Sequence, residues 1–379
     1  MPAGRPDGNR STVPPVAPPC PDALREAADP GKGDPVHDGL LEHLTSAATE
    51  AAASPDPVTA GLRLAEALGG TLPRPGGGRT VTLWEALATL GAVDLTVARV
   101  VEPHLDACAV LAEAGMECPA GATFGVYAAE AAGQRLEARS LQEGVVLDGT
   151  KPWCSLADQV SHALVTAWVG PDQRGLFLVD LVDRGVRTDP DAPAWGARGL
   201  AAVTSTGLVL ERVAAVPVGE PGWYLTRPGF AWGGIGGAAV WFGGAVGVAR
   251  RVRRGLGTRQ PDQVGLLHLG ELDVALAAGR AALAGAARVV DGGSDGGVDG
   301  AVAARLALQV RSQVAATVET VLRVADHALG PAPLALEEEH ARRVEDLRLY
   351  VRQHHAERDL AALGRAVLEA DDAPGWSWW

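Results

Sequence analysis

The hydrophobic periodicity of this chain changes twice along its length, and this feature constrains the fold most. Apolar residues recur at three- and four-residue spacing over residues 40–68 and 83–114, as in amphipathic helices. Between residues 121 and 218 the pattern becomes short β-branched runs separated by turn signals such as Asp148–Gly149. Helical spacing returns after Pro228. The order of elements is therefore predicted to be helices, then antiparallel strands, then helices.

These changes predict an α+β protein with five segments. A tail at residues 1–35 is rich in Pro, Gly and Asp without apolar periodicity, so we expect it to be disordered. Residues 36–117 form the predicted N-terminal helical domain, residues 118–225 the central β domain and residues 226–372 the C-terminal helical bundle. Residues 373–379 form a short tail rich in Trp.

Charge and cysteine content exclude several classes of partner. The formal net charge of −13 would repel phosphate backbones, so we expect no nucleic-acid partner. The four cysteines have no C-x-x-C spacing, which argues against a metal site and fits a reducing, cytoplasmic setting. The N-terminus lacks the apolar region of a signal peptide, and the Ala/Gly-rich run 233–248 is short for a membrane span. We expect no membrane association.

Four strings of residues occur in an order that one family shares. Gly149–Ser155 reads GTKPWCS and is similar to the G-x-K-x-W-I-T strand of the acyl-CoA dehydrogenase superfamily. Trp195–Ser205 is similar to the family's G-[LM]-R-x-[ST]-x-[ST] stretch, and Val213–Val218 to a strand that ends in V-P-x-x. Arg253–Gly257 resembles the R-x-x-F-G segment, with Leu256 in place of Phe. The resemblance extends over roughly residues 83–364.

The resemblance implies an N-terminal helical domain, a central antiparallel β domain and a C-terminal four-helix bundle, with FAD between the last two. Trp153 matches the family's Trp near the flavin, and Ser155 matches the hydroxyl at the flavin edge. Arg253 and Gln263 lie where an Arg and a Gln reach the FAD of a neighbouring subunit, which implies a homodimer or homotetramer. An Arg suits a pyrophosphate because its planar fork donates two parallel hydrogen bonds. A solvated Arg at a helix end is the alternative.

The chain departs from the family at the catalytic base. The family's reaction is α,β-dehydrogenation of an acyl thioester, in which a Glu removes the α-proton. The commonest position of this Glu falls on His354 here. The second position used in the family falls in Gly229–Arg254, which contains no Asp or Glu. An imidazole exchanges a proton near neutral pH, so His354 is the candidate acid/base.

The segment around His354 is predicted to be a single helix. Residues 344–370 are rich in Leu, Ala, Arg and Glu, which favour helix. On such a helix the carboxylate of Glu357 would orient the imidazole of His354. The alternative is that His354 and His355 form a polar stripe with Arg358 against another subunit.

Two flavin-binding strings of the family are also altered. The loop that caps the flavin with Thr and Ser hydroxyls corresponds to Val126–Gly133, which contains neither residue. Tyr127 in this loop offers a ring or a phenolic hydroxyl to the flavin. The family's Q-x-x-G-G-x-G string at the adenine end becomes Asp326–Pro331, which weakens the prediction of FAD binding.

Three functional hypotheses follow. The first is an FAD-dependent oxidoreductase that acts on an acyl thioester or a related small molecule, with His354 in place of the usual Glu. The second is a flavin-dependent monooxygenase of the same fold, which needs an imidazole or hydroxyl near the flavin more than a carboxylate. The third is a non-catalytic subunit that pairs with an active paralogue in a hetero-oligomer, because the usual Glu is missing from both positions.

Overall fold

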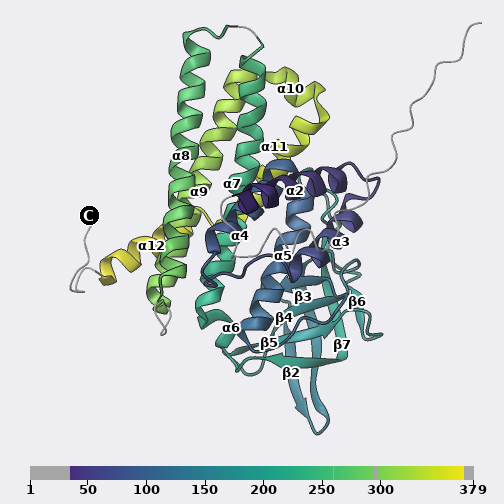
Figure 1. Cartoon of the computed structure of the whole chain (residues 1–379). Coiled ribbons are helices and arrows are strands. Elements are labelled where there is room, and N and C mark those ends of the chain that lie inside the picture. Colours follow the sequence, from purple (N-terminus) through teal and green to yellow (C-terminus); the bar gives the residue numbers. More distant parts are fainter. Residues whose placement is uncertain (1–34, 259, 294–297, 371–379) are drawn as a thin grey trace, which may run out of the picture.

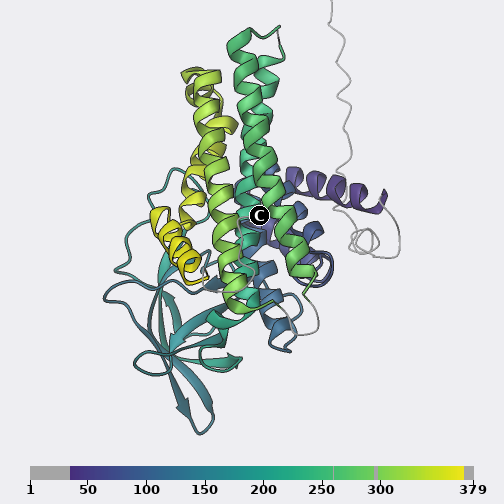
Figure 2. The same cartoon turned by 90° about the vertical axis from the view of Figure 1, so that its left-hand side faces the viewer.

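The computed structural model describes residues 35–258, 260–293 and 298–370. The two predicted tails, residues 1–35 and 373–379, therefore lie outside the described residues, apart from Pro35 at which α2 begins. Figures 1 and 2 show a group of helices with a small barrel of strands beneath it. The element order is helices, strands and helices, as the periodicity predicts.

Four helices precede the strands. They are α2 (Pro35–Ala52), α3 (Pro57–Gly69), α4 (Thr80–Val93) and α5 (Leu95–Glu113). Asp94 caps α5 by accepting a hydrogen bond from the Val97 backbone N–H, which satisfies one of the helix's free donors. Val97 and Val101 of the predicted apolar stripe are fully buried, and Cys108 is nearly so. The helical spacing read from this segment is therefore confirmed.

Seven strands form the central part. They are β1 (Phe124–Tyr127), β2 (Leu136–Leu141), β3 (Gly144–Ser155), β4 (His162–Trp168), β5 (Arg174–Asp180), β6 (Val186–Thr188) and β7 (Ser205–Val218). The pairings β4–β2, β2–β3, β3–β7, β7–β5 and β5–β4 return to their starting strand, so the sheet closes into a barrel.

The barrel is mixed, which corrects the prediction of an antiparallel domain. Strand β1 pairs with β4 in parallel, and β2 meets β4 in parallel at a single residue pair, whereas the remaining pairings are antiparallel. The cause is the connection over residues 128–135, which does not reverse the chain, so that β1 and β2 both run parallel to β4. The antiparallel β2–β3 hairpin then returns the chain, so β4 runs in the same direction as β1.

A register shift in β3 turns Trp153 outward. The pairing of β3 with β7 is irregular between Lys151 and Cys154. Trp153 lies in this irregularity with a φ of +59°, a value that non-glycine residues adopt rarely. Its side chain is 60% exposed, whereas the side chains of Lys151 and Cys154 are buried. The family-like Trp is thus presented on the surface of the barrel.

The helices after the barrel surround one central apolar helix. They are α6 (Trp223–Thr226), α7 (Pro228–Leu256), α8 (Gln263–Asp291), α9 (Gly300–Leu329), α10 (Pro331–Leu336), α11 (Glu338–Tyr350) and α12 (Glu357–Ala370). Helix α7 packs against α4, α5, α8, α9 and α11. By length and composition alone it is apolar enough to cross a membrane, but 78% of its apolar window is buried inside the protein. Helix α7 is therefore a core helix of the folded protein.

The single helix predicted over residues 344–370 is wrong. Helix α11 ends at Tyr350, a 3₁₀ turn follows over Val351–Gln353, and α12 begins at Glu357. One tertiary contact and one local contact at the start of α12 accompany the break. Arg311 of α9 donates a hydrogen bond to the Gln353 carbonyl, and the carboxylate of Asp359 accepts one from the backbone N–H of His355. Contacts of this kind outweigh the helix propensity of the segment.

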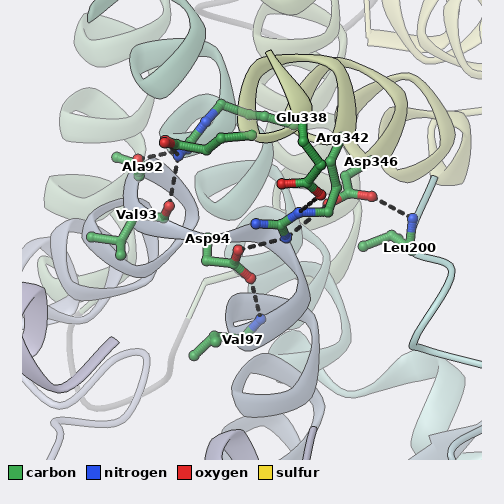
Figure 3. Close-up of polar contacts among 10 residues, drawn as sticks. Ala92, Val93, Asp94, Val97, Leu200, Glu338, Arg342 and Asp346 are labelled. Carbon is green, nitrogen blue, oxygen red and sulfur yellow. Dashed lines mark hydrogen bonds and ion pairs between the residues drawn. The ribbon is translucent and has the colours of Figure 1, made fainter. Parts of the chain in front are cut away.

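A polar cluster joins the three parts of the chain (Figure 3). Asp346 of α11 is buried and accepts a hydrogen bond from the Leu200 backbone N–H in the loop before β7. Arg342, one turn earlier, donates to Asp94 at 2.7 Å and so reaches the start of α5. Burial raises the pKa of Asp346 from 3.8 to about 6, against the opposing effects of the Leu200 N–H and Arg342.

Candidate active site

A cavity of about 820 Å³ lies between α5, α7 and α9. The end of β1, helix α6 and the segment before α12 complete its wall. Its size suits a small organic molecule. The cavity exists because the facing surfaces of α7 and α9 carry small residues, namely Gly233, Gly234, Gly237, Ala303, Ala304 and Ala307.

Helix α5 presents charged side chains to this cavity. Arg99, Glu102 and Asp106 are spaced by three and four residues, so they share one helix face. Tyr350 donates its hydroxyl hydrogen to Glu102 Oε2 at 3.2 Å, and Arg99 lies 3.8 Å from the same oxygen. Burial raises the pKa of Glu102. Burial, and then the nearby Glu102 carboxylate, raise the pKa of Asp106 to about 7.

The carboxyl groups of Glu102 and Asp106 were missed by the sequence analysis. Neither of the two positions at which the family keeps its Glu lies in α5. The available signal was the pair of acidic residues four apart in a largely apolar helix. Such a pair is common on solvated helix faces, so the sequence alone does not distinguish the two cases.

The predicted flavin contact Ser155 is linked to the cavity. Its hydroxyl oxygen lies 2.7 Å from the hydroxyl oxygen of Ser205 on the paired strand. Arg99, which lines the cavity, donates a hydrogen bond to Ser155 Oγ at 3.3 Å. Trp153 lies two residues before Ser155 on β3 with its ring exposed. The two hydroxyls suit hydrogen bonds to the edge of a flavin ring, and the exposed Trp153 ring suits stacking on its face.

Tyr127 is not exposed, as a side chain that waits to contact a flavin would be. Its side chain is buried, and its hydroxyl donates a hydrogen bond to the Ser155 carbonyl at 2.9 Å. Burial raises the pKa of this phenol well above its ordinary value. The hydroxyl therefore ties β1 to β3, while the neighbouring Val126 and Ala128 line the cavity. A flavin contact by Tyr127 stays a prediction.

The loop that lacks Thr and Ser is held by a buried ion pair instead. Glu130 accepts hydrogen bonds from Lys151 at 2.7 Å and from Arg174 at 3.2 Å. Lys151 is fully buried and also donates to the Thr166 hydroxyl. This pairing connects the Lys of the GTKPWCS string to the segment whose residue Ala129 faces the cavity. It holds the loop against the barrel.

The structure places His355, the residue after His354, in the cavity wall. His354 is 8% exposed, and its Nε2 lies 3.1 Å from Ser312 Oγ and 3.7 Å from Asp359 Oδ2. Burial lowers the pKa of His354. His355 Nδ1 lies 3.2 Å from Asp359 Oδ1, and Asp359 also lines the cavity. Glu357 is exposed at the start of α12, so Asp359 is the carboxylate beside both imidazoles.

Arg253 and Gln263 lie far from the other predicted flavin contacts. Both are exposed, at the end of α7 and the start of α8 respectively. Figure 1 shows this end of the bundle pointing away from the barrel. Within one chain they do not meet Trp153 or Ser155. Their predicted contact with the flavin of a neighbouring subunit requires an oligomer and stays a prediction.

No group of three or more potential metal ligands occurs within the described ranges 35–258, 260–293 and 298–370.

The solved structures that resemble this chain include both dehydrogenases and monooxygenases. Glutaryl-CoA dehydrogenase from Mycobacterium smegmatis in complex with FADH2 is 18% identical, with a TM-score of 0.70 over 86% of this chain and 94% of that chain. Dibenzothiophene monooxygenase TdsC from Paenibacillus sp. A11-2 is 18% identical, with a TM-score of 0.69 over 92% of this chain and 97% of that chain.

A third neighbour was solved with an amino sugar nucleotide. KijD3 in complex with FMN and dTDP-3-amino-2,3,6-trideoxy-4-keto-3-methyl-D-glucose is 18% identical, with a TM-score of 0.71 over 94% of this chain and 95% of that chain. No protein-family model and no curated protein matches the sequence. At these identities the likeness establishes the fold. The chain has the acyl-CoA dehydrogenase fold, as the sequence resemblance predicts.

Proposed function

We propose that this protein is a flavin-dependent oxidoreductase that acts on a small molecule in the cavity between α5, α7 and α9. The observation that carries the proposal is the link from Ser155 through Arg99 to a cavity lined by acid and base groups. The flavin proteins that share the fold support it. A flavin bound against Ser155 and Trp153 would supply the electron acceptor or donor.

We infer that the flavin is FAD, held by Trp153 and Ser155 of one subunit and by Arg253 and Gln263 of a neighbour. The altered string Asp326–Pro331 makes FMN the competitor, and the solved neighbours include complexes with FMN and with FADH2. The test is to denature the purified holoprotein and identify the released flavin. Reconstitution with each flavin follows, and a clear preference for FMN would overturn this assignment.

The acid/base group that faces the substrate is best assigned to His355, with Asp359 as its positioning residue. His354 holds the family's position in the sequence, but the imidazole in the cavity wall belongs to His355. The Asp359 carboxylate fixes this ring by bonding both its Nδ1 and the His355 backbone N–H. For an acyl thioester, the imidazole would remove the α-proton while the flavin accepts the hydride.

The variant His355→Ala should lower kcat at least about a hundredfold, because general acid/base groups contribute about 10²–10⁴-fold. Asp359→Asn should shift the pH dependence of kcat and should change KM less. His354→Ala is the matched comparison: full activity there supports His355. Loss of activity in His354→Ala with normal activity in His355→Ala would restore His354 as the acid/base group.

Oxygenation is the second candidate, and the imidazoles at the place of the usual Glu favour it. The two reactions are separated by their dependence on oxygen. Bleaching of bound oxidised flavin by an acyl thioester without oxygen supports dehydrogenation. Oxygen consumption that needs added reduced flavin, with none from an acyl thioester, supports the monooxygenase.

The third hypothesis, a non-catalytic subunit, is tested by assembly. A homodimer or homotetramer with turnover excludes it, whereas co-purification of a paralogue of similar size supports it. Light scattering of the purified protein gives the mass. The same measurement decides whether Arg253 and Gln263 have a neighbouring subunit to contact.

A further inference from the structure

One end of the cavity holds a carboxylate, that of Asp106, which accepts no hydrogen bond from the described residues. This end is formed by Asp106 of α5, by Arg227 just before α7 and by the aromatic rings of Tyr224 and Phe230. It lies about seven residues along α5 from Arg99, or roughly 10 Å at 1.5 Å per residue. It is therefore separate from the Arg99–Ser155 contact at which the flavin is proposed to bind.

Asp106 points into this end with no hydrogen-bond donor from the described part of the chain. The cations nearby are already engaged. Arg227 pairs with Glu113, and Arg311 donates to two backbone carbonyls. Gly233 faces the Asp106 carboxylate, where a Cβ atom would collide with Oδ1. The glycine thus leaves the carboxylate open to the cavity.

Arg227 lies beside this carboxylate with its charge already matched. Its side chain is 2% exposed, and one terminal nitrogen binds the Glu113 carboxylate. Its Nε is buried without a hydrogen-bond partner among the described residues and has no accessible surface toward the cavity. The Asp106 carboxylate is therefore the group at this end with which a ligand can pair.

We propose that this end of the cavity binds a primary amine with an apolar chain. The ammonium group pairs with the Asp106 carboxylate. The aromatic rings of Tyr224 and Phe230 cover the carbon skeleton. The inference deepens the proposed function, because it rests on this cavity being the substrate site.

The pH dependence of amine binding follows from the charged and titratable groups that face Asp106. These are Glu102 and Glu113, whose carboxylates raise its pKa, and Arg227, whose cation lowers it, with burial as the largest cause. The phenol of Tyr224 also faces it and stays neutral, because burial raises its pKa. The Asp106 carboxyl takes up a proton below about pH 7 in the empty cavity, so amine binding weakens as the pH falls through that value.

The test compares two ligands of one chain length, octylamine and octanol. Binding is measured by calorimetry on the full-length holoprotein. The wild type should bind octylamine about tenfold to a hundredfold tighter than octanol, as expected for a hydrogen bond to a charged group. Asp106→Asn should lose the preference for amines and still bind octanol.

The control variant is Asp172→Asn, which removes the same charge from an exposed turn and should keep the preference. Asp106→Ser serves as a second variant if Asp106→Asn misfolds. Equal binding of octylamine and octanol by the wild type, or an amine preference that survives in both Asp106 variants, overturns the proposal. Flavin content is measured on the same samples. Normal flavin with no amine preference refutes this subsite alone, whereas failure to bind flavin refutes the proposed function.

Discussion

Lys151 offers the sharpest test of how the cavity loop is held. Its side chain is fully buried, and it donates to Glu130 at 2.7 Å and to Thr166 at 2.9 Å. Removing one partner of a buried ion pair costs about 3–5 kcal/mol. In Lys151→Met the remaining Glu130 is 29% exposed and keeps Arg174, so we expect a loss of about 2–4 kcal/mol in the free energy of unfolding.

The reverse variant, Glu130→Gln, leaves the buried Lys151 cation without its carboxylate. Burial already lowers the pKa of Lys151, so we expect the lysine to lose its proton more readily in this variant. The double variant should lose less than the sum of the single variants, by roughly 1.5–3 kcal/mol, because neither charge is then left unpaired. Urea denaturation monitored by Trp fluorescence measures all four proteins.

A matched control is the exposed pair Arg187–Glu211, which has the same 2.7 Å separation. Its side chains are 50% and 65% exposed, so Arg187→Met should cost less than about 1 kcal/mol. The reasoning is refuted if Lys151→Met costs no more than Arg187→Met. It is also refuted if the two single effects at Lys151 and Glu130 add within about 0.5 kcal/mol.

Two further predictions concern the flavin edge and the polar cluster that joins the domains. Ser155→Ala should weaken flavin binding about threefold to tenfold, the effect of one neutral hydrogen bond, and an unchanged Kd from flavin fluorescence titration would remove Ser155 from the site. The folded-state pKa of Asp346 is raised to about 6 from 3.8, so its ionisation lowers stability as the pH rises between these values. Asp346→Asn removes this cost. As the pH rises past 6, the free energy of unfolding of the variant, measured by urea denaturation, should increase relative to that of the wild type by up to about 3 kcal/mol. A gap that does not change with pH would contradict the buried, ionised carboxylate.

The sequence predicts the fold largely through local features. The switch between helical and strand periodicity locates the barrel, and Gly149–Ser155 identifies the strand that presents Trp153. The break of the helix at Val351–Gln353 is not local, because the contact from Arg311 that accompanies it comes from α9, far away in the sequence. The parallel pairing of β1 with β4 likewise depends on the path of the chain between them.

The site was predictable only where it follows family positions. Ser155, which the family position selects, is linked to the cavity by the hydrogen bond from Arg99, and its contact with a flavin stays a prediction. The cavity imidazole falls one residue later than predicted, at His355, because the chain leaves helical geometry just before it. The spacing of Glu102 and Asp106 is the one local sign of the role of Asp106, and a solvated helix face shows the same spacing. Burial and the Glu102 carboxylate raise the pKa of Asp106, and its open face depends on the glycine that α7 brings opposite it.

The visible absorption spectrum of the purified protein, with identification of any released flavin, tests the central claim most directly. We predict the two absorption bands of an oxidised flavin, either as isolated or after incubation with FAD. Ser155→Ala should bind this flavin more weakly, while Asp172→Asn should bind it like the wild type. A folded protein that stays colourless after incubation with both FAD and FMN would contradict the assignment of this fold and cavity to flavin chemistry.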